Sequence, residues 1–435
     1  MSTYSSIGIM MTNNFFQKSL GRWQQSRSSF NLTFCGFGFY AFILINDFFN
    51  WPLLQFARVV SPIKFRDTSW VLADADCYEK IGSGIYGLES ETGCPGYLYG
   101  SSLLRLLNFL NIHEYHTHIF VIVMRAFFAI AAAYVVVKMS TTSRQALLIF
   151  VLISFSPGVQ LMLYNANFDL LIFAMLVASH FAFKENLIII SLTLIFLSGA
   201  FKFYTIPLLL VMAFFVPKIR QKLVAVIFFI IAFGLAVSDL KLMQEEIPST
   251  GYAQFGLTVF TRYIQEIGLS VSTIYGFLLS FALFMATLYL SFITKAKIKL
   301  MVVESDPDRL LMFMMLGIVF LSCFFTGLSY DPRLIYLSLS ATIVIVQFPS
   351  SLYKRISLAL VGISSFLSCG IELGFMPMGE TAFHPARVIQ LLNDIAIEFL
   401  TAFILLCLID MCASSKSRTS LRMLFQSEVR NTEKS

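Results

Sequence analysis

The sequence predicts an all-helical protein that crosses a membrane about 12 times, within a range of about 10 to 13 segments. The first observation is composition: 57% of the 435 residues are hydrophobic and only 13% are charged, whereas water-soluble proteins carry about 25% charged residues. The second is pattern, because the apolar residues form continuous runs rather than the alternating segments of ~10 residues typical of an outer-membrane barrel. The bilayer is therefore the main solvent of this chain.

The apolar stretches follow one another along the chain, and acidic and basic residues keep to the gaps between them. A spanning helix needs ~20 residues to cross the ~30 Å hydrocarbon core, so the fourth to sixth stretches are short. We expect these three to be tilted, broken or re-entrant and shielded by protein, and whether residues 187–216 cross or re-enter stays open. The stretches are 31–49, 117–137, 145–163, 168–183, 187–201, 203–216, 223–240, 268–293, 310–328, 334–349, 356–373 and 388–412.

The placement of Lys and Arg predicts that both termini are cytoplasmic. Cationic loops resist translocation, and in this orientation about two thirds of the basic residues lie on cytoplasmic segments. The net charge of +6 then reflects topology and attraction to anionic membrane lipid, and it does not indicate nucleic acid as a partner. We expect a multi-pass protein of the plasma (inner) membrane.

The chain is expected to form one integral domain, because neither a repeat of fixed period nor a cleavable signal is visible. The longest early gap, residues 50–117, becomes the first extracytoplasmic loop. The boundaries we expect are 1–30 for a cytoplasmic N-terminal segment, 31–412 for the membrane domain and 413–435 for a basic cytoplasmic tail.

Two further apolar pieces, residues 97–110 and 253–265, predict short amphipathic helices lying at the outer membrane surface. Such helices would shape a cavity at the outer leaflet, although packing or lipid contact alone is the alternative. The apolar side chains that share one helical face are Leu103, Leu106, Leu107 and Leu110 in the first piece, and Phe255, Val259, Phe260 and Tyr263 in the second.

The first outer loop carries three carboxylates within six residues: Asp74, Asp76 and Glu79. Carboxylates at this spacing can bind a divalent cation, or one of them can accept a proton from a hydroxyl nucleophile. Burial near the membrane would raise the basicity of such a group, which suits a general base. A solvated acidic turn is the alternative. If a metal ion is bound, Asp74 and Asp76 are its candidate ligands.

Cationic residues also lie between apolar stretches on the expected outer side. Lys202 separates two apolar runs, and Arg333 precedes another. An ionisable residue embedded among apolar neighbours is costly, so it usually has a partner or a task. Arg can hold a phosphate with a bidentate fork and Lys can hold it as a point charge. The alternative for either residue is snorkelling to lipid headgroups.

Cys77 and Cys94 both lie in the first outer loop. An oxidising compartment would let them form a disulfide that constrains the acidic segment. Two free thiols are the alternative, because spacing alone does not show that the geometry is feasible.

Three sequence blocks, taken together and in order, resemble the GT-C superfamily of integral-membrane glycosyltransferases. The closest resemblance is to its DUF2029-type branch, which is related to the polyprenol-phosphate-mannose-dependent mannosyltransferases. The blocks are Asp74 four residues before Tyr78 with Gly84-Ile85-Tyr86 following, NANFDLLIF at 165–173 with FKFYT at 201–205, and SYDPRLIYL at 329–337. The chain departs from the family pattern at Asn165-Ala166, Thr205 and Pro332, which replace Arg-Gly, a proline and an aromatic residue.

The resemblance implies transfer of a sugar, mannose in the first instance, from a polyprenyl-phosphate-linked donor to a glycan or lipid acceptor at the outer face, with inversion at the anomeric carbon. Asp74 would be the general base and Asp76 the second candidate. Lys202 and Arg333 would bind the departing lipid phosphate. The supporting residues would be Tyr78, Asn167, Asp169, Tyr204 and Asp331.

No resident cofactor is expected with certainty, and the participation of a divalent cation stays open. A polytopic transporter, or a lipid-linked saccharide flippase or polymerase, is the alternative function. A transporter would be expected to show two related halves with interrupted helices in matching positions, and we see no such internal symmetry.

Overall fold

The computed structural model describes the central part of the chain in most detail. The residues it describes are 38–41, 43, 45, 65–81, 100–140, 142–216, 218–243, 254–255, 278, 281, 282, 284–287, 289, 306–325, 329–330, 333–347, 352–367 and 385–413. The N-terminal segment 1–30, nearly all of the tail 413–435, and most of the stretches 31–49 and 268–293 lie outside the described residues.

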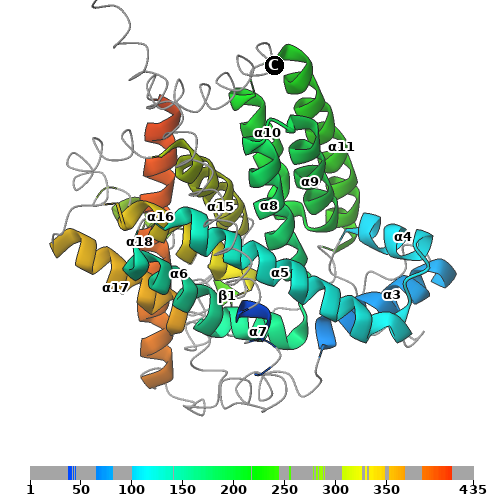
Figure 1. Cartoon of the computed structure of the whole chain (residues 1–435), viewed down its shortest axis with the longest axis horizontal. Coiled ribbons are helices and arrows are strands. Elements are labelled where there is room, and N and C mark those ends of the chain that lie inside the picture. The colour runs from blue at the N-terminus through cyan, green and yellow to red at the C-terminus, as the bar shows by residue number, and fades with distance from the viewer. Residues whose placement is uncertain are drawn as a thin grey trace, which may run out of the picture.

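The described part is helical, apart from one pair of two-residue strands, so the all-α prediction is confirmed there (Figure 1). The α-helices are α3 Arg66–Ile81, α4 Ser101–Phe109, α5 Thr117–Met139, α6 Ser143–Phe155, α7 Pro157–Asn165, α8 Asp169–Lys184, α9 Ile188–Phe201, α10 Ile206–Phe215, α11 Ile219–Met243, α15 Pro307–Phe325, α16 Leu334–Ile345, α17 Leu352–Phe366 and α18 Pro385–Ala413. Two 3-10 turns, η2 Glu114–His116 and η3 Phe203–Thr205, precede α5 and α10, and the strands are β1 Gln254–Phe255 and β2 Ser329–Tyr330.

Four helices of the described part are long and apolar enough to cross a membrane, over residues Glu114–Met139, Ile219–Asp239, Pro307–Phe325 and Leu391–Cys412. A fifth span results if α6 and α7, which meet at an angle of 49°, count as one broken crossing. The protein is therefore membrane-embedded. Helices α9 and α16 and the η3–α10 segment are shorter apolar helices. The total of about 12 membrane-crossing segments stays a prediction.

Exposed apolar surface on the spans is consistent with contact with lipid. Only 17% of the apolar span of α11 is buried inside the protein, whereas 72% of the apolar span of α15 is buried. The side chains of Ile227, Ile230 and Phe233 on α11 are all more than half exposed. Apolar area of this extent is unfavourable in water, so α11 is a peripheral helix facing lipid and α15 a central one.

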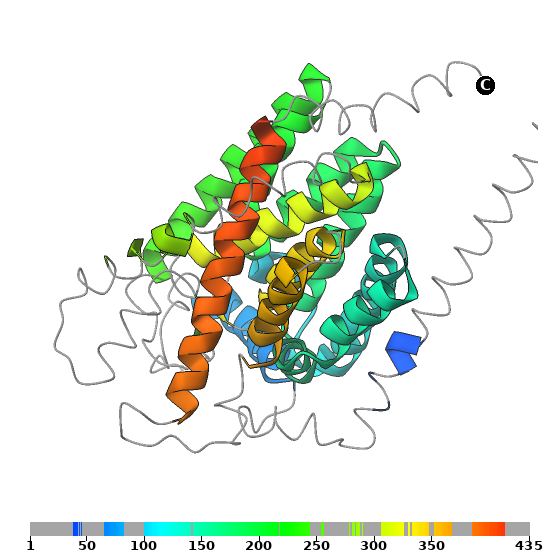
Figure 2. The same ribbon diagram turned by 90° about the vertical axis from the view of Figure 1, so that its left-hand side faces the viewer.

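Helices α8 to α11 lie side by side on one flank of the molecule, and α15 to α18 form the other (Figure 1). Figure 2 shows α18 running the length of the second group, where it packs against α15, α16 and α17. The close approach of α15 to α18 depends on Gly317, because a β-carbon there would lie 3.0 Å from the Ile404 side chain. Small residues at such crossings favour association of helices in a bilayer, where lipid tails are as apolar as the side chains.

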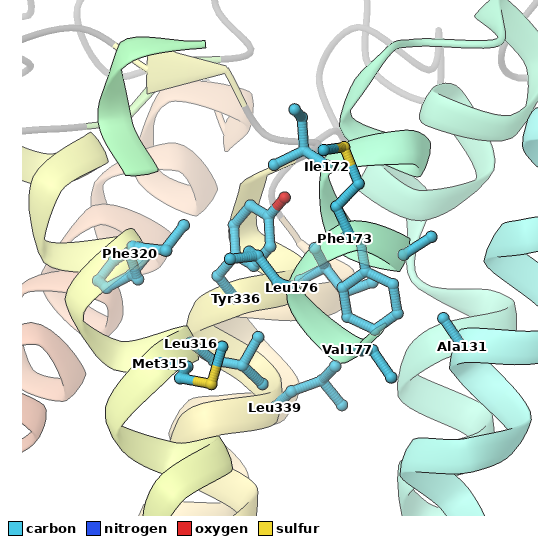
Figure 3. Packing of buried hydrophobic residues seen from close by; sticks show 14 of the residues in the cluster. Ala131, Ile172, Phe173, Leu176, Val177, Met315, Leu316, Phe320, Tyr336 and Leu339 are labelled. Atoms are coloured by element: carbon cyan, nitrogen blue, oxygen red, sulfur yellow. The ribbon is translucent and has the colours of Figure 1, made fainter. Parts of the chain in front are cut away.

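The core joins the two groups. Figure 3 shows Phe173 and Leu176 of α8 near Leu316 of α15 and Tyr336 of α16, all of them buried. The rings of Phe173 and Tyr336 lie 6.4 Å apart between centroids. Because α8 packs on α5 as well as on α15, it is the hub of the described fold, and the first turn of this buried helix is where the polar site begins.

Hydrogen bonds hold the start of helix α3 and the start of helix α4 against this core. Before its first residue, the backbone N–H of Phe65 donates to the Tyr164 carbonyl at 3.1 Å, and Thr68 donates to the Ala166 carbonyl. After α3, Gly100 donates to the Phe201 carbonyl at 3.2 Å. A β-carbon at Gly100 would lie 2.3 Å from the Ala200 carbonyl oxygen, so only glycine fits this contact.

The two surface-helix predictions have different outcomes. Residues 101–109 form α4 as expected, with Leu103 and Leu107 buried, whereas Leu110 follows the helix and is 52% exposed. The helix predicted for 253–265 is wrong at its start, because Gln254 and Phe255 form strand β1 and pair with Tyr330 and Ser329. Pairing two extended segments satisfies backbone groups that a surface helix would otherwise have satisfied internally. The rest of that piece lies outside the described residues.

Candidate functional site

Three charged residues predicted from the sequence meet at one buried position. The Lys202 ammonium lies 3.0 Å from Asp169 Oδ1, and the Arg333 Nε lies 3.6 Å from Asp169 Oδ2. The Lys202 and Asp169 side chains are only 2% and 3% exposed, whereas that of Arg333 keeps 18%. We call these three residues the ion cluster. Arg333 is its accessible edge.

Each member of the ion cluster lies where a helix begins or breaks. Asp169 is the first residue of α8 and Arg333 immediately precedes α16. Lys202 adopts extended backbone angles (φ −140°, ψ 114°) between α9 and the 3-10 turn η3. The helix therefore ends where Lys202 interrupts the apolar run. This interruption allows the lysine side chain to reach the first turn of α8.

Tyr204 supports the cluster from the same 3-10 turn. Its hydroxyl donates a hydrogen bond to Asp169 Oδ1. Its ring lies under the Arg333 guanidinium, 4.8 Å from centroid to carbon, which is within the range of a cation–π contact. Tyr204, predicted as a supporting residue, therefore makes two contacts with the cluster.

Asn167 connects the ion cluster to helix α3. Its Oδ1 accepts hydrogen bonds from the Lys202 ammonium and from the Asp169 backbone N–H, both at 2.9 Å. Its Nδ2 donates to Asp67 Oδ2 at 2.6 Å. One amide thus links a carboxylate on α3 to a buried cation between α9 and α10.

Asp67 is a site residue that the sequence reasoning missed. It lies in the first turn of α3, seven residues before Asp74, so the two carboxylates share a helical face and lie about 10 Å apart along the axis. Burial raises the pKa of Asp67 to about 6, against the opposing effects of Lys202 and the Asn167 amide. Recognising residues 66–81 as a helix would have shown this seven-residue relation.

Asp74 lies on the inward face of α3. It is 1% exposed, and its Oδ1 has no hydrogen-bond partner among the residues that the structure describes. Burial raises the pKa of Asp74 to about 8. A buried carboxyl with an unsatisfied oxygen is unfavourable for folding, so this group is retained at a cost to stability.

The structure does not bring Asp76 to the same place as Asp74. Two residues along a helix turn the side chain by about 200°, and Asp76 instead contacts His113 Nδ1 at 2.6 Å and the Glu114 backbone N–H at 3.3 Å. Asp76 therefore does not share the surroundings of Asp74, because the segment is a helix and the two side chains lie on different sides of it. Asp76 ties α3 to η2, and Glu79 is exposed.

Tyr78, predicted as a supporting residue, contacts α4. Its hydroxyl accepts a hydrogen bond from Arg105 Nε at 3.1 Å. It lies about three turns from Asp67 along α3, so it is separated from the ion cluster. Asp331, the remaining supporting residue, lies outside the described residues.

No group of three or more His, Cys, Asp or Glu side chains in the described part of the chain could hold a metal ion. The candidate ligands Asp74 and Asp76 point to different sides of α3, so a divalent cation would need ligands beyond these residues. Cys77 is disulfide-bonded in the structure. The pairing of Cys77 with Cys94 stays a prediction, because Cys94 lies outside the described residues.

A second set of buried polar groups lies within the span of α18. Asn393 and Glu398 are 0% and 1% exposed. Both oxygens of Glu398 and both polar atoms of the Asn393 amide lack a hydrogen-bond partner within the described ranges. Ionisable residues inside a membrane usually face a cavity or a partner, so these two residues also mark a candidate functional position.

Comparison of the chain with protein-family models, with curated proteins and with solved structures finds no match. The resemblance to the GT-C glycosyltransferases therefore depends on the three sequence blocks alone.

Proposed function

We propose that the protein is an integral-membrane glycosyltransferase. It would transfer a sugar, with mannose as the first candidate, from a polyprenyl-phosphate donor to a glycan or lipid acceptor. The observation that carries the proposal is the convergence of Lys202 and Arg333 at a buried site, which Asn167 links to the helix that carries Asp74. The resemblance of the three sequence blocks adds support.

The ion cluster is suited to a lipid-phosphate leaving group. As the bond between the anomeric carbon and the phosphate oxygen breaks, negative charge grows on the phosphate, and fixed cations stabilise the transition state most strongly where that charge develops. Arg333 is the exposed member and would make the first contact. Lys202, held by Asp169 and Asn167, is already positioned and needs little reorganisation.

Asp74 would act as the general base. The acceptor hydroxyl oxygen attacks the anomeric carbon on the face opposite the phosphate, its proton passes to the Asp74 carboxylate, and polyprenyl phosphate departs, so the configuration inverts. A base with a pKa near the working pH is the most effective, and burial raises the pKa of Asp74 to about 8. Along α3, Asp74 lies about 10 Å from Asp67, the carboxylate that Asn167 links to Lys202.

The remaining expectations belong to the same proposal. The chain would cross the plasma (inner) membrane about 12 times, with both termini in the cytoplasm and the site on the extracytoplasmic face. The end of the bundle that carries α3 would then face outward. Asp308 pairs with Lys184 at the opposite end of α8 from Asp169. Alkylation of single cysteines introduced beside Asp67 and beside Asp308 in intact cells tests this orientation, since only the first is expected to react with an impermeant reagent.

A polytopic transporter or flippase is the second candidate. The observation that favours it is the pair of buried polar residues within the span of α18, Asn393 and Glu398. Carboxyl groups at membrane depth often belong to ion or substrate paths. A transporter would move its substrate across a sealed vesicle without converting it, which separates the two candidates.

The experiment for the proposal uses the full chain in nanodiscs. Radiolabelled polyprenyl-phosphate sugars are supplied one at a time with a membrane lipid extract, and wild type is compared with Asp74→Asn and with Glu79→Gln, the matched control at an exposed carboxylate of the same helix. Transfer of label by wild type and Glu79→Gln but not by Asp74→Asn supports the proposal and identifies the sugar. Equal transfer by Asp74→Asn removes Asp74 as the base, and absence of transfer with every donor directs attention to substrate flux.

A further inference from the structure

We propose that binding of the donor's phosphodiester to the ion cluster is coupled to protonation of Asp67, which is thereby a positioning residue of the donor site. This inference depends on the proposed function, because it concerns how the same cations bind a lipid phosphate. It assigns a role to a residue that lies outside all three sequence blocks.

The charges around the cluster balance when no ligand is bound. Lys202 and Arg333 contribute two positive charges, and Asp169 and Asp67 contribute two negative charges when both are ionised. The contacts are continuous: Asp67 to Asn167 at 2.6 Å, Asn167 to Lys202 at 2.9 Å and Lys202 to Asp169 at 3.0 Å. A phosphodiester brings a further negative charge into this largely buried group. Protonation of one carboxylate restores neutrality.

Asp67 is the carboxylate that is easier to protonate. Asp169 is held by Lys202, Arg333 and the Tyr204 hydroxyl, all of which favour its charged form. Asp67 is hydrogen-bonded to the neutral amide of Asn167, which in turn accepts a hydrogen bond from Lys202. It is also less deeply buried than Asp169, so a proton can reach it from solvent.

Other charged groups near α3 have different contacts. Arg66 stacks on Trp70, with its guanidinium carbon 4.0 Å from the ring centroid. Arg125 of α5 stacks on Phe65 at 4.8 Å and donates to the Leu163 carbonyl. Arg66 lowers the pKa of Asp67 less than Lys202 does. Lys202 is thus the dominant cation for Asp67, and a ligand that shares Lys202 acts directly on Asp67.

The remaining titratable groups that pack on α3 lie toward its other end. His113 and the backbone of Glu114 contact Asp76, and Arg105 contacts Tyr78. Asp76 is nine residues from Asp67, or about 13 Å along the helix axis. Electrostatic coupling between a phosphate at Lys202 and these groups is therefore weaker than its coupling to Asp67.

The sign of the coupling follows from the charges. Burial raises the pKa of Asp67 to about 6 in the unliganded protein, and a bound phosphodiester would raise it further by repelling the carboxylate. Donor affinity is therefore highest when Asp67 is protonated. As pH rises above about 6, the dissociation constant is expected to increase by about tenfold per pH unit until the pKa of the liganded state is reached.

The test measures binding of a short-chain polyprenyl-phosphate mannose to the full-length protein in nanodiscs between pH 5 and 8, without acceptor. This diester is used because its charge is constant over that range, whereas a phosphate monoester titrates near pH 6. Wild type should lose affinity as pH rises. Asp67→Asn, which stays neutral, should bind tightly at every pH, and Glu79→Gln should follow wild type.

A second measurement needs no variant at Asp67. Wild-type protein in weak buffer near pH 7 should take up as much as about one proton per donor bound, and Asp74→Asn should take up the same amount, because Asp74 is not the coupled group. Binding that is independent of pH, or without proton uptake, overturns the coupling and leaves the glycosyltransferase proposal intact. Failure of wild type to bind any polyprenyl-phosphate sugar at any pH overturns both.

Discussion

Replacing Asp74 with Asn is predicted to stabilise the protein at high pH while it abolishes transfer. In the folded protein burial raises the pKa of Asp74 to about 8, whereas in the unfolded chain it lies near 4. The folded state therefore binds the proton more tightly. The stability that this provides is fully present below about pH 4 and is lost progressively as pH rises to about 8.

The size of the effect follows from the two pKa values. A difference of about four pH units corresponds to about 5 kcal/mol, at roughly 1.4 kcal/mol per unit. Asn has the shape of the protonated carboxyl and no charge to desolvate. The free energy of unfolding of the variant therefore lacks the pH dependence that Asp74 causes in wild type. Above pH 8 we expect Asp74→Asn to unfold with a free energy higher than that of wild type by several kcal/mol, on the order of this difference.

The assay is reversible unfolding of the detergent-solubilised protein by increasing mole fraction of a denaturing detergent at pH 5, 7 and 9. Wild type and Glu79→Gln should lose stability together as pH rises, and Asp74→Asn should change little. Superimposable pH profiles for wild type and Asp74→Asn would show that Asp74 is solvated in the folded protein. Such a result would also remove the basis for treating it as a base with a raised pKa.

Three further predictions concern the ion cluster and the disulfide. Asp169→Asn should destabilise the protein by about 3 to 5 kcal/mol, because it removes the carboxylate that faces the buried Lys202 ammonium and the half-buried Arg333 guanidinium, and combining it with Lys202→Met should recover part of that loss in the same unfolding assay. Lys202→Ala and Arg333→Ala should each raise the KM for the polyprenyl-phosphate donor more than the KM for the acceptor, and equal effects on both would indicate lipid snorkelling instead. Reduction followed by alkylation and mass spectrometry should identify Cys94 as the partner of Cys77, and recovery of Cys94 alkylated without prior reduction would exclude that pairing.

The apolar runs predicted most of the described helices closely. The stretch at 117–137 corresponds to α5 Thr117–Met139, and the stretch at 388–412 lies within α18 Pro385–Ala413. A membrane helix satisfies its own backbone hydrogen bonds, so its position depends on local composition and can be read from the sequence. The pairing of Gln254 with Tyr330 could not be read in this way, because it depends on a contact between distant segments.

The ion cluster was partly predictable for a reason that concerns topology. If consecutive stretches cross in alternating directions, the gaps after the third, fifth and ninth stretches fall on the same side, and the last two of these gaps hold Lys202 and Arg333. Asp169 lies at the start of the stretch that follows the first of these gaps, so alternation brings the three residues to one end of the bundle, but it does not make them neighbours. Their contact requires α8, η3 and α16 to meet, which depends on the packing of Tyr204 against Tyr336 and is not encoded in any single segment.

Asp67 shows where sequence reasoning stopped. Its neighbours Asp74 and Asp76 drew attention because they are close together in the chain, yet the helix separates those two and instead aligns Asp67 with Asp74. The contact that gives Asp67 its importance is with Asn167, 100 residues away. If donor binding and proton uptake are coupled as proposed, then the spacing that matters in this segment is seven residues, the distance between two carboxylates on one face of a helix, and not the two-residue spacing that is obvious in the sequence.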